Sequence, residues 1–191
     1  MPEPAPLDTT PSPAAIARRI DRPLVLVGLM GAGKSTVGRR LAAALGFAFV
    51  DADEEIERAA QMAIPEIFEA YGEPYFRSGE RRVIARLIDE AGAGCVIATG
   101  GGAFVDPETR ALILDKAIAI WLDGDLDTLV QRVSRRSNRP LLHERDPREV
   151  LARLKAEREP AYVQAPIRIA SQPGPHQRMV AAILRELDAW L

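Results

Sequence analysis

Short apolar runs alternate along the chain with longer segments in which apolar residues recur every three or four positions. The short runs are typical of strands that are buried on both faces of a sheet, and the longer pattern is typical of amphipathic helices. The pattern predicts strands at residues 24–28, 47–53, 95–102, 117–124 and 167–171. It predicts helices at residues 34–45, 53–61, 64–72, 73–92, 107–116, 125–136, 148–162 and 176–191.

This alternation of strands and helices favours a three-layer α/β fold, in which helices cover both faces of a five-stranded parallel sheet. Ligands of such folds bind beyond the carboxyl ends of the strands. The length of 191 residues suits a single domain, which we place at residues 22–191. Residues 1–21 are rich in proline, alanine and threonine, and we interpret them as a disordered tail.

The overall composition narrows the class of protein. With 47% hydrophobic and 27% charged residues, the chain is typical of globular proteins. A formal net charge of -2 gives no support for nucleic acid or an anionic membrane as a partner. No apolar run approaches the ~20 residues that span a bilayer. Cys95 is the single cysteine, so no intrachain disulfide is expected, and a reducing cytoplasm is the expected location.

A glycine-rich loop follows the first predicted strand. Its sequence, GLMGAGKS from Gly28 to Ser35, matches the phosphate-binding pattern G-x-x-x-x-G-K-[ST]. Glycines allow the backbone to wrap around a phosphate, and the helix that follows presents its positive end to the same anion. We expect Lys34 to reach the terminal phosphates and the Ser35 hydroxyl to bind Mg²⁺. The loop therefore predicts a nucleotide site, which kinases, switches and motors all share.

Two further predicted strands end in residues that could bind a ligand or take part in catalysis. Asp51 and Asp53 close the second strand, where either could cap the next helix. Beside a phosphate loop they also suit two other tasks, since one carboxylate can hold the waters of Mg²⁺ and the other can orient an attacking hydroxyl. Gly100, Gly101 and Gly102 follow the third strand and would let the backbone approach a ligand closely.

Three arginines lie near predicted loops or helix ends, namely Arg77, Arg139 and Arg158. A guanidinium binds a carboxylate or phosphate through two parallel hydrogen bonds. Two such residues aimed at one pocket would indicate a substrate with a carboxylate, and a third in a loop would indicate closure over a nucleotide. Other helical arginines, Arg81 among them, are expected to face solvent, and His176 is expected in a loop without a chemical role.

Taken together, these motifs resemble the shikimate kinase family from residue 24 to the closing helix. The matching motifs occur in the family's order and at compatible spacings: GLMGAGKSTVGRRLA, FVDADEEIE, IPEIFEAYGEPYFRSGE, ATGGGA, NRPLL and EREPAY. The phosphate loop is shared with many families, whereas the other motifs as a set are specific. The resemblance implies a P-loop kinase fold with a substrate-binding helical region at about 52–81 and a lid loop at about 135–147.

The resemblance also implies roles for individual residues. Lys34 would stabilise the transferred phosphoryl group, and Ser35 and Asp51 would hold Mg²⁺ and its waters. Asp53 would bind the ring hydroxyls of shikimate and position the one that attacks. The residues implied at ATP are Gly31, Ala32, Gly33, Lys34, Ser35, Thr36, Arg132 and Arg139. The residues implied at shikimate are Asp53, Phe68, Phe76, Arg77, Glu80, Gly100, Gly101, Gly102 and Arg158.

The implied activity is transfer of the γ-phosphate of ATP to the 3-hydroxyl of shikimate, in aromatic amino-acid biosynthesis. Arg77 and Arg158 would clamp the shikimate carboxylate, and Arg139 would close from the lid over the phosphates. The family also implies a monomer. Two alternatives stay open: a related small-molecule kinase, such as one for gluconate, and a nucleotide-dependent regulatory module without catalysis. The presence of Lys34, Asp53 and Arg139 argues against the second alternative.

Overall fold

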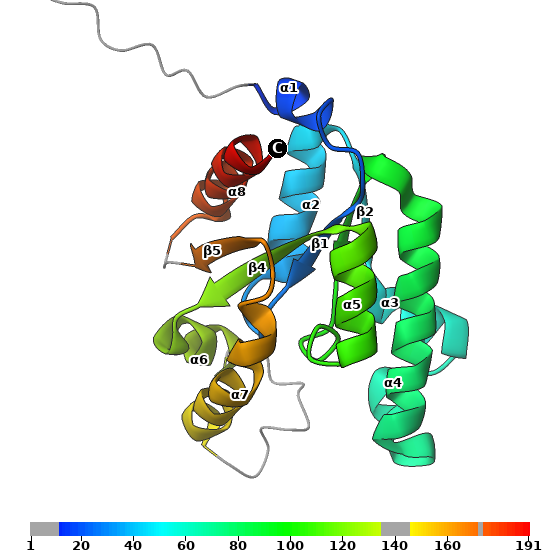
Figure 1. The fold of residues 1–191 in the computed structure, drawn as a ribbon. Helices are drawn as coiled ribbons and strands as arrows, with labels where there is room; N and C mark the ends of the chain where they lie inside the picture. The colour runs from blue at the N-terminus through cyan, green and yellow to red at the C-terminus, as the bar shows by residue number, and fades with distance from the viewer. Residues whose placement is uncertain (1–11, 135–145, 172–173) are drawn as a thin grey trace, which may run out of the picture.

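The computed structural model describes residues 12–134, 146–171 and 174–191. Most of the predicted lid, with Arg139, lies outside the described residues. Within them, five parallel strands form one sheet in the order β2-β3-β1-β4-β5 (Figure 1). The strands are β1 (Leu24–Val27), β2 (Ala48–Asp51), β3 (Cys95–Ala98), β4 (Ile118–Gly124) and β5 (Ile167–Ser171). The predicted fold class is confirmed.

The strand order brings together the ends of the three strands that carry the candidate functional residues. The central strand β1 is buried along its whole length and pairs with β3 on one side and β4 on the other. β2 pairs with β3, so β2, β3 and β1 are consecutive neighbours. Because parallel strands end at the same edge of a sheet, the phosphate loop, Asp51 and the run of glycines after β3 meet at one edge.

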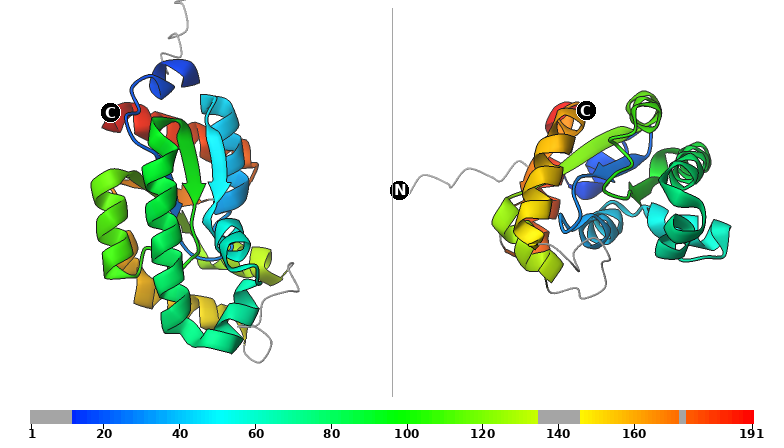
Figure 2. Two further views of the ribbon diagram at one scale, coloured as in Figure 1. Left: turned by 90° about the vertical axis from the view of Figure 1, so that its right-hand side faces the viewer. Right: turned by 90° about the horizontal axis from the view of Figure 1, so that it is seen from below.

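Helices cover both faces of the sheet, as a parallel sheet requires (Figure 2). On one face lie α2 (Lys34–Leu45) and α8 (His176–Trp190), and on the other lie α4 (Ile64–Ala91) and α5 (Pro107–Lys116). At the carboxyl edge, α3 (Ala52–Ala60) packs against α4, and α6 (Leu126–Ser134) packs against α7 (Pro147–Tyr162). A short 3₁₀ helix, Gly92–Gly94, leads into β3.

The long helix α4 contains the break that the sequence predicted near residue 72. Gly72 has φ of 78° and ψ of 174°, which is not helical, and Pro74 follows two residues later. Proline cannot donate the hydrogen bond of a helix interior, and glycine adopts the left-handed φ at little cost. The two predicted helices at 64–72 and 73–92 are therefore confirmed as two segments of α4 that meet at a kink.

The prediction of a disordered tail is wrong for residues 12–21. Helix α1 (Pro13–Ala17) forms there, and the Ser12 side chain caps it by accepting a hydrogen bond from the Ala15 amide. Ile16 and Ile20 are buried, α1 packs against α2 and α8, and Arg19 pairs with Asp188 of α8 at 2.5 Å. Burying two isoleucines contributes about 2–3 kcal/mol each, which offsets the ordering of a short segment.

Two predicted strands are also shorter than expected. β2 ends at Asp51 because this residue caps α3, and β3 ends at Ala98 because the glycines after it turn back on themselves. In that turn, the Ala103 amide donates to the Gly100 carbonyl and the Val105 amide donates to the Gly102 carbonyl. The helices of the described ranges are all too short or too polar to cross a bilayer.

Candidate active site

The phosphate loop folds as a tight turn between β1 and α2. Gly28, Gly31 and Gly33 have φ of 137°, 81° and 92°, a region that favours glycine. A Cβ at Gly28 would lie 2.6 Å from the Leu122 carbonyl oxygen of neighbouring β4, so a larger residue would push the strands apart. Gly33 is the N-cap of α2. The first turn of a helix leaves amide groups available to an anion, as the predicted phosphate site requires.

The Lys34 ammonium lies inside this loop. Its side chain is buried, and Nζ donates to the carbonyl oxygens of Gly28 at 2.7 Å and Leu29 at 2.9 Å. A lysine in the first turn of α2 therefore has its charge at the place where the loop would surround a phosphate. Burial in a low-dielectric site strengthens the attraction of this charge for an anion.

Ser35 and Asp51 lie side by side although they are 16 residues apart. Ser35 Oγ donates to Asp51 Oδ2 at 2.6 Å, and Asp51 Oδ1 accepts from the Asp53 amide at 3.1 Å. Asp51 therefore caps α3 with one oxygen and faces the phosphate loop with the other. A hydroxyl and a carboxylate are the hard oxygen ligands that Mg²⁺ prefers.

The donor set fits Mg²⁺ as it is held at phosphate-transfer sites. In the ranges that the structure describes, no group of three or more His, Cys, Asp or Glu is arranged to hold a metal ion. A cation at Ser35 and Asp51 would therefore take its other ligands from phosphates and water, and Mg²⁺ commonly keeps several waters and binds substrate phosphates in this way.

A cleft of about 790 Å³ opens at this edge of the sheet. Ten residues that the sequence assigned to the site line it: Gly31, Gly33, Lys34, Ser35, Thr36, Asp51, Asp53, Gly100, Gly101 and Arg132. Ala32, within the loop, is fully buried. The cleft also has lining residues to which no role was assigned, and these include Thr128, Gln131, Gly174 and His176.

The far end of the cleft is formed by α6 and α8. Arg132 Nη1 lies 3.3 Å from the carbonyl oxygens of both Gly31 and Ala32, so this guanidinium lies across the phosphate loop. His176 is the first residue of α8 and lines the cleft, so the expectation that it lies in a loop is wrong. Burial, Arg132 and Arg40 lower the pKa of His176, and the neutral imidazole is favoured.

Asp53 connects the cleft with the turn after β3. A Cβ at Gly100 would lie 2.8 Å from Asp53 Oδ1 and 3.1 Å from Glu80 Oε1, so glycine leaves room for both carboxylates. The close packing of this turn against charged side chains explains the glycine at residue 100.

Arg77 and Glu80 form a partly buried ion pair on α4, beside the same turn. Arg77 Nη1 donates to Glu80 Oε2 at 2.6 Å, and Glu80 is 2% exposed. Burial raises the pKa of Glu80, and Arg77 opposes this rise only in part. Burial also acts to lower the pKa of Arg77, but Glu80 and Glu73 outweigh it and raise that pKa. The ion pair holds the Arg77 guanidinium beside Glu80.

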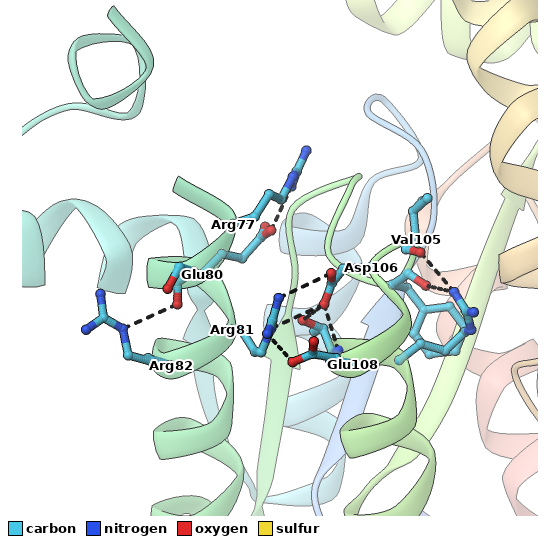
Figure 3. Close-up of polar contacts among 11 residues, drawn as sticks. Arg77, Glu80, Arg81, Arg82, Val105, Asp106 and Glu108 are labelled. Carbon is cyan, nitrogen blue, oxygen red and sulfur yellow. Dashed lines mark hydrogen bonds and ion pairs between the residues drawn. The ribbon is translucent and has the colours of Figure 1, made fainter. Parts of the chain in front are cut away.

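A second ion-pair cluster holds α4 to the segment that follows the glycines (Figure 3). Arg81 pairs with Asp106 and with Glu108 at the start of α5. Asp106 Oδ2 also caps α5 by accepting from the Thr109 amide at 2.8 Å. The expectation that Arg81 faces solvent is wrong, because its side chain bridges α4 and α5. A helical periodicity cannot reveal a partner 25 residues away.

Arg158 reaches the turn from the opposite side, on α7. A Cβ at Gly101 would lie 3.3 Å from Arg158 Nη1, and a Cβ at Gly102 would overlap the Arg77 guanidinium. The two arginines that the sequence singled out on α4 and α7 therefore both contact the glycine turn. Their convergence leaves two guanidinium groups at one end of the site.

Phe68 and Phe76, which the resemblance implies at shikimate, lie outside the cleft lining. The Phe68 and Phe76 rings contact each other with centroids 4.5 Å apart, and Phe76 is buried in the core. Phe76 borders a smaller hollow of about 310 Å³ between α3 and α4. Arg77, Glu80, Gly102 and Arg158 are also absent from the lining of the large cleft and form a layer beside it.

The fold and the phosphate loop define the chain as a P-loop nucleotide-binding protein, and comparisons with known proteins identify its family. The family model described as Shikimate kinase matches residues 30–188. A protein named Shikimate kinase from Novosphingobium aromaticivorans is 65% identical over 181 residues, with 92% of each chain covered. The chain therefore belongs to the shikimate kinase family.

Solved structures agree with this assignment. A shikimate kinase from Acinetobacter baumannii in complex with shikimate superposes with a TM-score of 0.84 at 36% identity, covering 91% of this chain and 97% of that chain. A gluconokinase from Sinorhizobium meliloti has a TM-score of 0.61 at 18% identity, covering 90% of this chain and 94% of that chain. The second likeness shows a shared fold alone.

Proposed function

We propose that this protein transfers the γ-phosphate of ATP to the 3-hydroxyl of shikimate, giving shikimate 3-phosphate and ADP. This step belongs to the biosynthesis of chorismate and the aromatic amino acids. One observation carries the proposal beyond family membership: Asp53 lies between the phosphate loop and a turn that two arginines contact. A phosphate donor on one side and a carboxylate-binding pair on the other suit a carboxylated alcohol as acceptor.

On the donor side, residues 31–36 surround the phosphates of ATP, and Lys34 stabilises the transferred group. Ser35 and Asp51 hold Mg²⁺, which supplies further positive charge to the phosphates when bound. Arg132 contacts the adenine. The family resemblance also assigns Arg139, which lies outside the described residues, to the phosphates. The loose transition state of phosphoryl transfer spreads negative charge over the equatorial oxygens, so fixed positive groups accelerate it.

On the acceptor side, Arg77 and Arg158 hold the carboxylate of shikimate. Glu80 keeps Arg77 in place, and the amides of residues 100–102 contact the ring hydroxyls. Phe68 and Phe76 supply the apolar wall beneath the ring. Asp53 accepts a hydrogen bond from the 3-hydroxyl and directs its oxygen at the γ-phosphate, which makes the transfer a positioned, nearly unimolecular step.

The proposal also covers the oligomeric state of the protein and its location in the cell. We assign a monomer, as the family resemblance implies. A reducing cytoplasm suits a chain whose single cysteine, Cys95, is buried in β3.

An acceptor comparison tests the proposal. ADP release from Mg²⁺-ATP is followed with shikimate, with gluconate and without acceptor. Strong turnover with shikimate alone is expected, because gluconate lacks the ring that places its hydroxyl relative to the carboxylate. Turnover with gluconate would contradict the assignment of shikimate as the acceptor. ATP hydrolysis that does not depend on an acceptor would contradict the assignment of the protein as a kinase.

A further inference from the structure

Tyr162, the last residue of α7, is buried beneath the glycine turn. Its side chain is 2% exposed, and its hydroxyl donates a hydrogen bond to the Gly101 carbonyl oxygen across 61 residues of sequence. Burial raises the pKa of Tyr162 to about 12, and the charge of Arg158 opposes this rise. The phenol is therefore neutral at physiological pH and keeps the proton that it donates.

Arg158 lies one helical turn before Tyr162, on the same face of α7. The charge of Arg158 acts on the Tyr162 hydroxyl, because it opposes the rise in the pKa of Tyr162, and Arg158 Nη1 lies 3.3 Å from the position of a Cβ at Gly101. The hydroxyl donates to the same turn that the arginine contacts, so Tyr162 and Arg158 meet at Gly101. A nearby cation polarises a neutral hydroxyl in the sense that strengthens its hydrogen bond to the carbonyl.

The space beside Gly101 that Arg158 borders is also bordered by the phosphate loop. A Cβ there would lie 3.3 Å from the Met30 amide nitrogen and 3.6 Å from the Gly28 carbonyl oxygen. The Tyr162 ring also stacks on Trp121 with centroids 5.8 Å apart, and Trp121 Cδ1 lies 3.4 Å from the position of a Cβ at Gly28. Tyr162 therefore contacts two residues, Gly101 and Trp121, that lie next to the phosphate loop.

We propose that Tyr162 is a positioning residue, which sets the distance between the arginine that binds the acceptor carboxylate and the loop that binds the donor phosphates. The inference rests on the proposed function, because it assigns Arg158 to the carboxylate. The hydroxyl acts through Arg158 and Gly101 and does not touch the reacting atoms. Removing it would take this donor from the Gly101 carbonyl and would relax the turn that Arg158 contacts.

Tyr162→Phe removes only the hydroxyl and keeps the stack on Trp121. We expect the KM for shikimate to rise about tenfold, the loss expected when a buried carbonyl is left without its hydrogen-bond donor. We expect the KM for ATP and kcat to stay within about twofold. Tyr75→Phe is the matched control, because Tyr75 is 51% exposed on α4 and should leave every constant unchanged.

A double-mutant cycle tests whether Tyr162 acts through Arg158. If it does, Tyr162→Phe should have little further effect on the KM for shikimate in an Arg158→Ala background. Additive effects would overturn the inference, as would an unchanged KM in the single variant. Equal rises in the KM for shikimate and the KM for ATP, or a fall in kcat alone, would also overturn the inference, because these results indicate a purely structural tyrosine.

Hydrogen exchange separates this inference from the proposed function. In the protein without ligands, Tyr162→Phe should speed amide exchange at residues 100–103 by about tenfold, while Tyr75→Phe should not. This result would support the positioning of the turn even if shikimate proved to be the wrong acceptor. Unchanged exchange would overturn the positioning even if wild-type protein phosphorylated shikimate.

Discussion

The donor half and the acceptor half of the site are built in different ways. The phosphate-binding part of the donor half comes from one stretch, residues 28–36, and its shape follows from positive φ angles at glycines and the start of α2. The acceptor half comes from α3, α4, the turn after β3 and α7, and paired side chains hold it together. A loop shaped by its own backbone should tolerate substitutions elsewhere in the chain. A site assembled from side chains of several elements depends on each contact between them.

A change to Lys34 should produce the largest effect in the donor half. Lys34→Met keeps the length of the side chain but removes its charge from the loop. We expect kcat to fall about a hundred- to a thousandfold, because a fixed charge at the transferred group is lost, while the KM for shikimate changes little. Steady-state kinetics with each substrate varied measures both constants. Lys116→Met, which removes a surface partner of Asp89, should change neither.

A change at Gly102 should affect the acceptor half selectively. In Gly102→Ala, the new methyl would lie 2.7 Å from Arg77 Cζ and force the guanidinium to move. We expect the KM for shikimate to rise about tenfold or more, with the KM for ATP nearly unchanged.

Gly94→Ala is the matched control, since a Cβ there meets no atom within 4 Å. A similar loss in both alanine variants would show that the effect is not specific to Arg77. An equal rise in both KM values of Gly102→Ala would show that the two halves are not independent.

Glu80 should give the smallest effect, which appears in stability. Its pKa is raised in the folded state above the ordinary value of 4.5, mainly by burial. The stability that follows from this raised pKa is present below the unfolded-state pKa and is lost as pH rises through the folded-state pKa. The glutamine in Glu80→Gln does not titrate. The free energy of unfolding of the variant should therefore increase relative to that of wild type as pH rises above 4.5. Denaturant unfolding at several pH values measures this difference, and parallel curves would contradict it.

The sequence predicted the elements whose signals are local. All five strands, the phosphate loop and the break in α4 follow from apolar periodicity and from glycine and proline. Helix α1 was missed because the composition of residues 1–21 hid a usable signal: Ser12 as a cap, Pro13 at the first turn, and Ile16 and Ile20 four residues apart.

The acceptor side was harder to predict from the sequence. The roles of Arg77, Glu80 and Arg158 came from a family resemblance, because spacing alone does not bring α4 and α7 to one turn. The hydrogen bond from Tyr162 to Gly101 and the bridge from Arg81 to Asp106 had no local signal. His176 did have one, since the helix after β5 must begin at the carboxyl edge where the ligands bind.

The central claim is that donor and acceptor meet at Asp53, and Asp53→Asn tests it most directly. The measurement is kcat for shikimate phosphorylation together with the Kd for ATP by titration calorimetry, for the variant and for wild type. The account predicts that kcat falls about a hundredfold or more while the Kd for ATP stays nearly unchanged. Near-normal turnover, or a matching loss of ATP affinity, would contradict it.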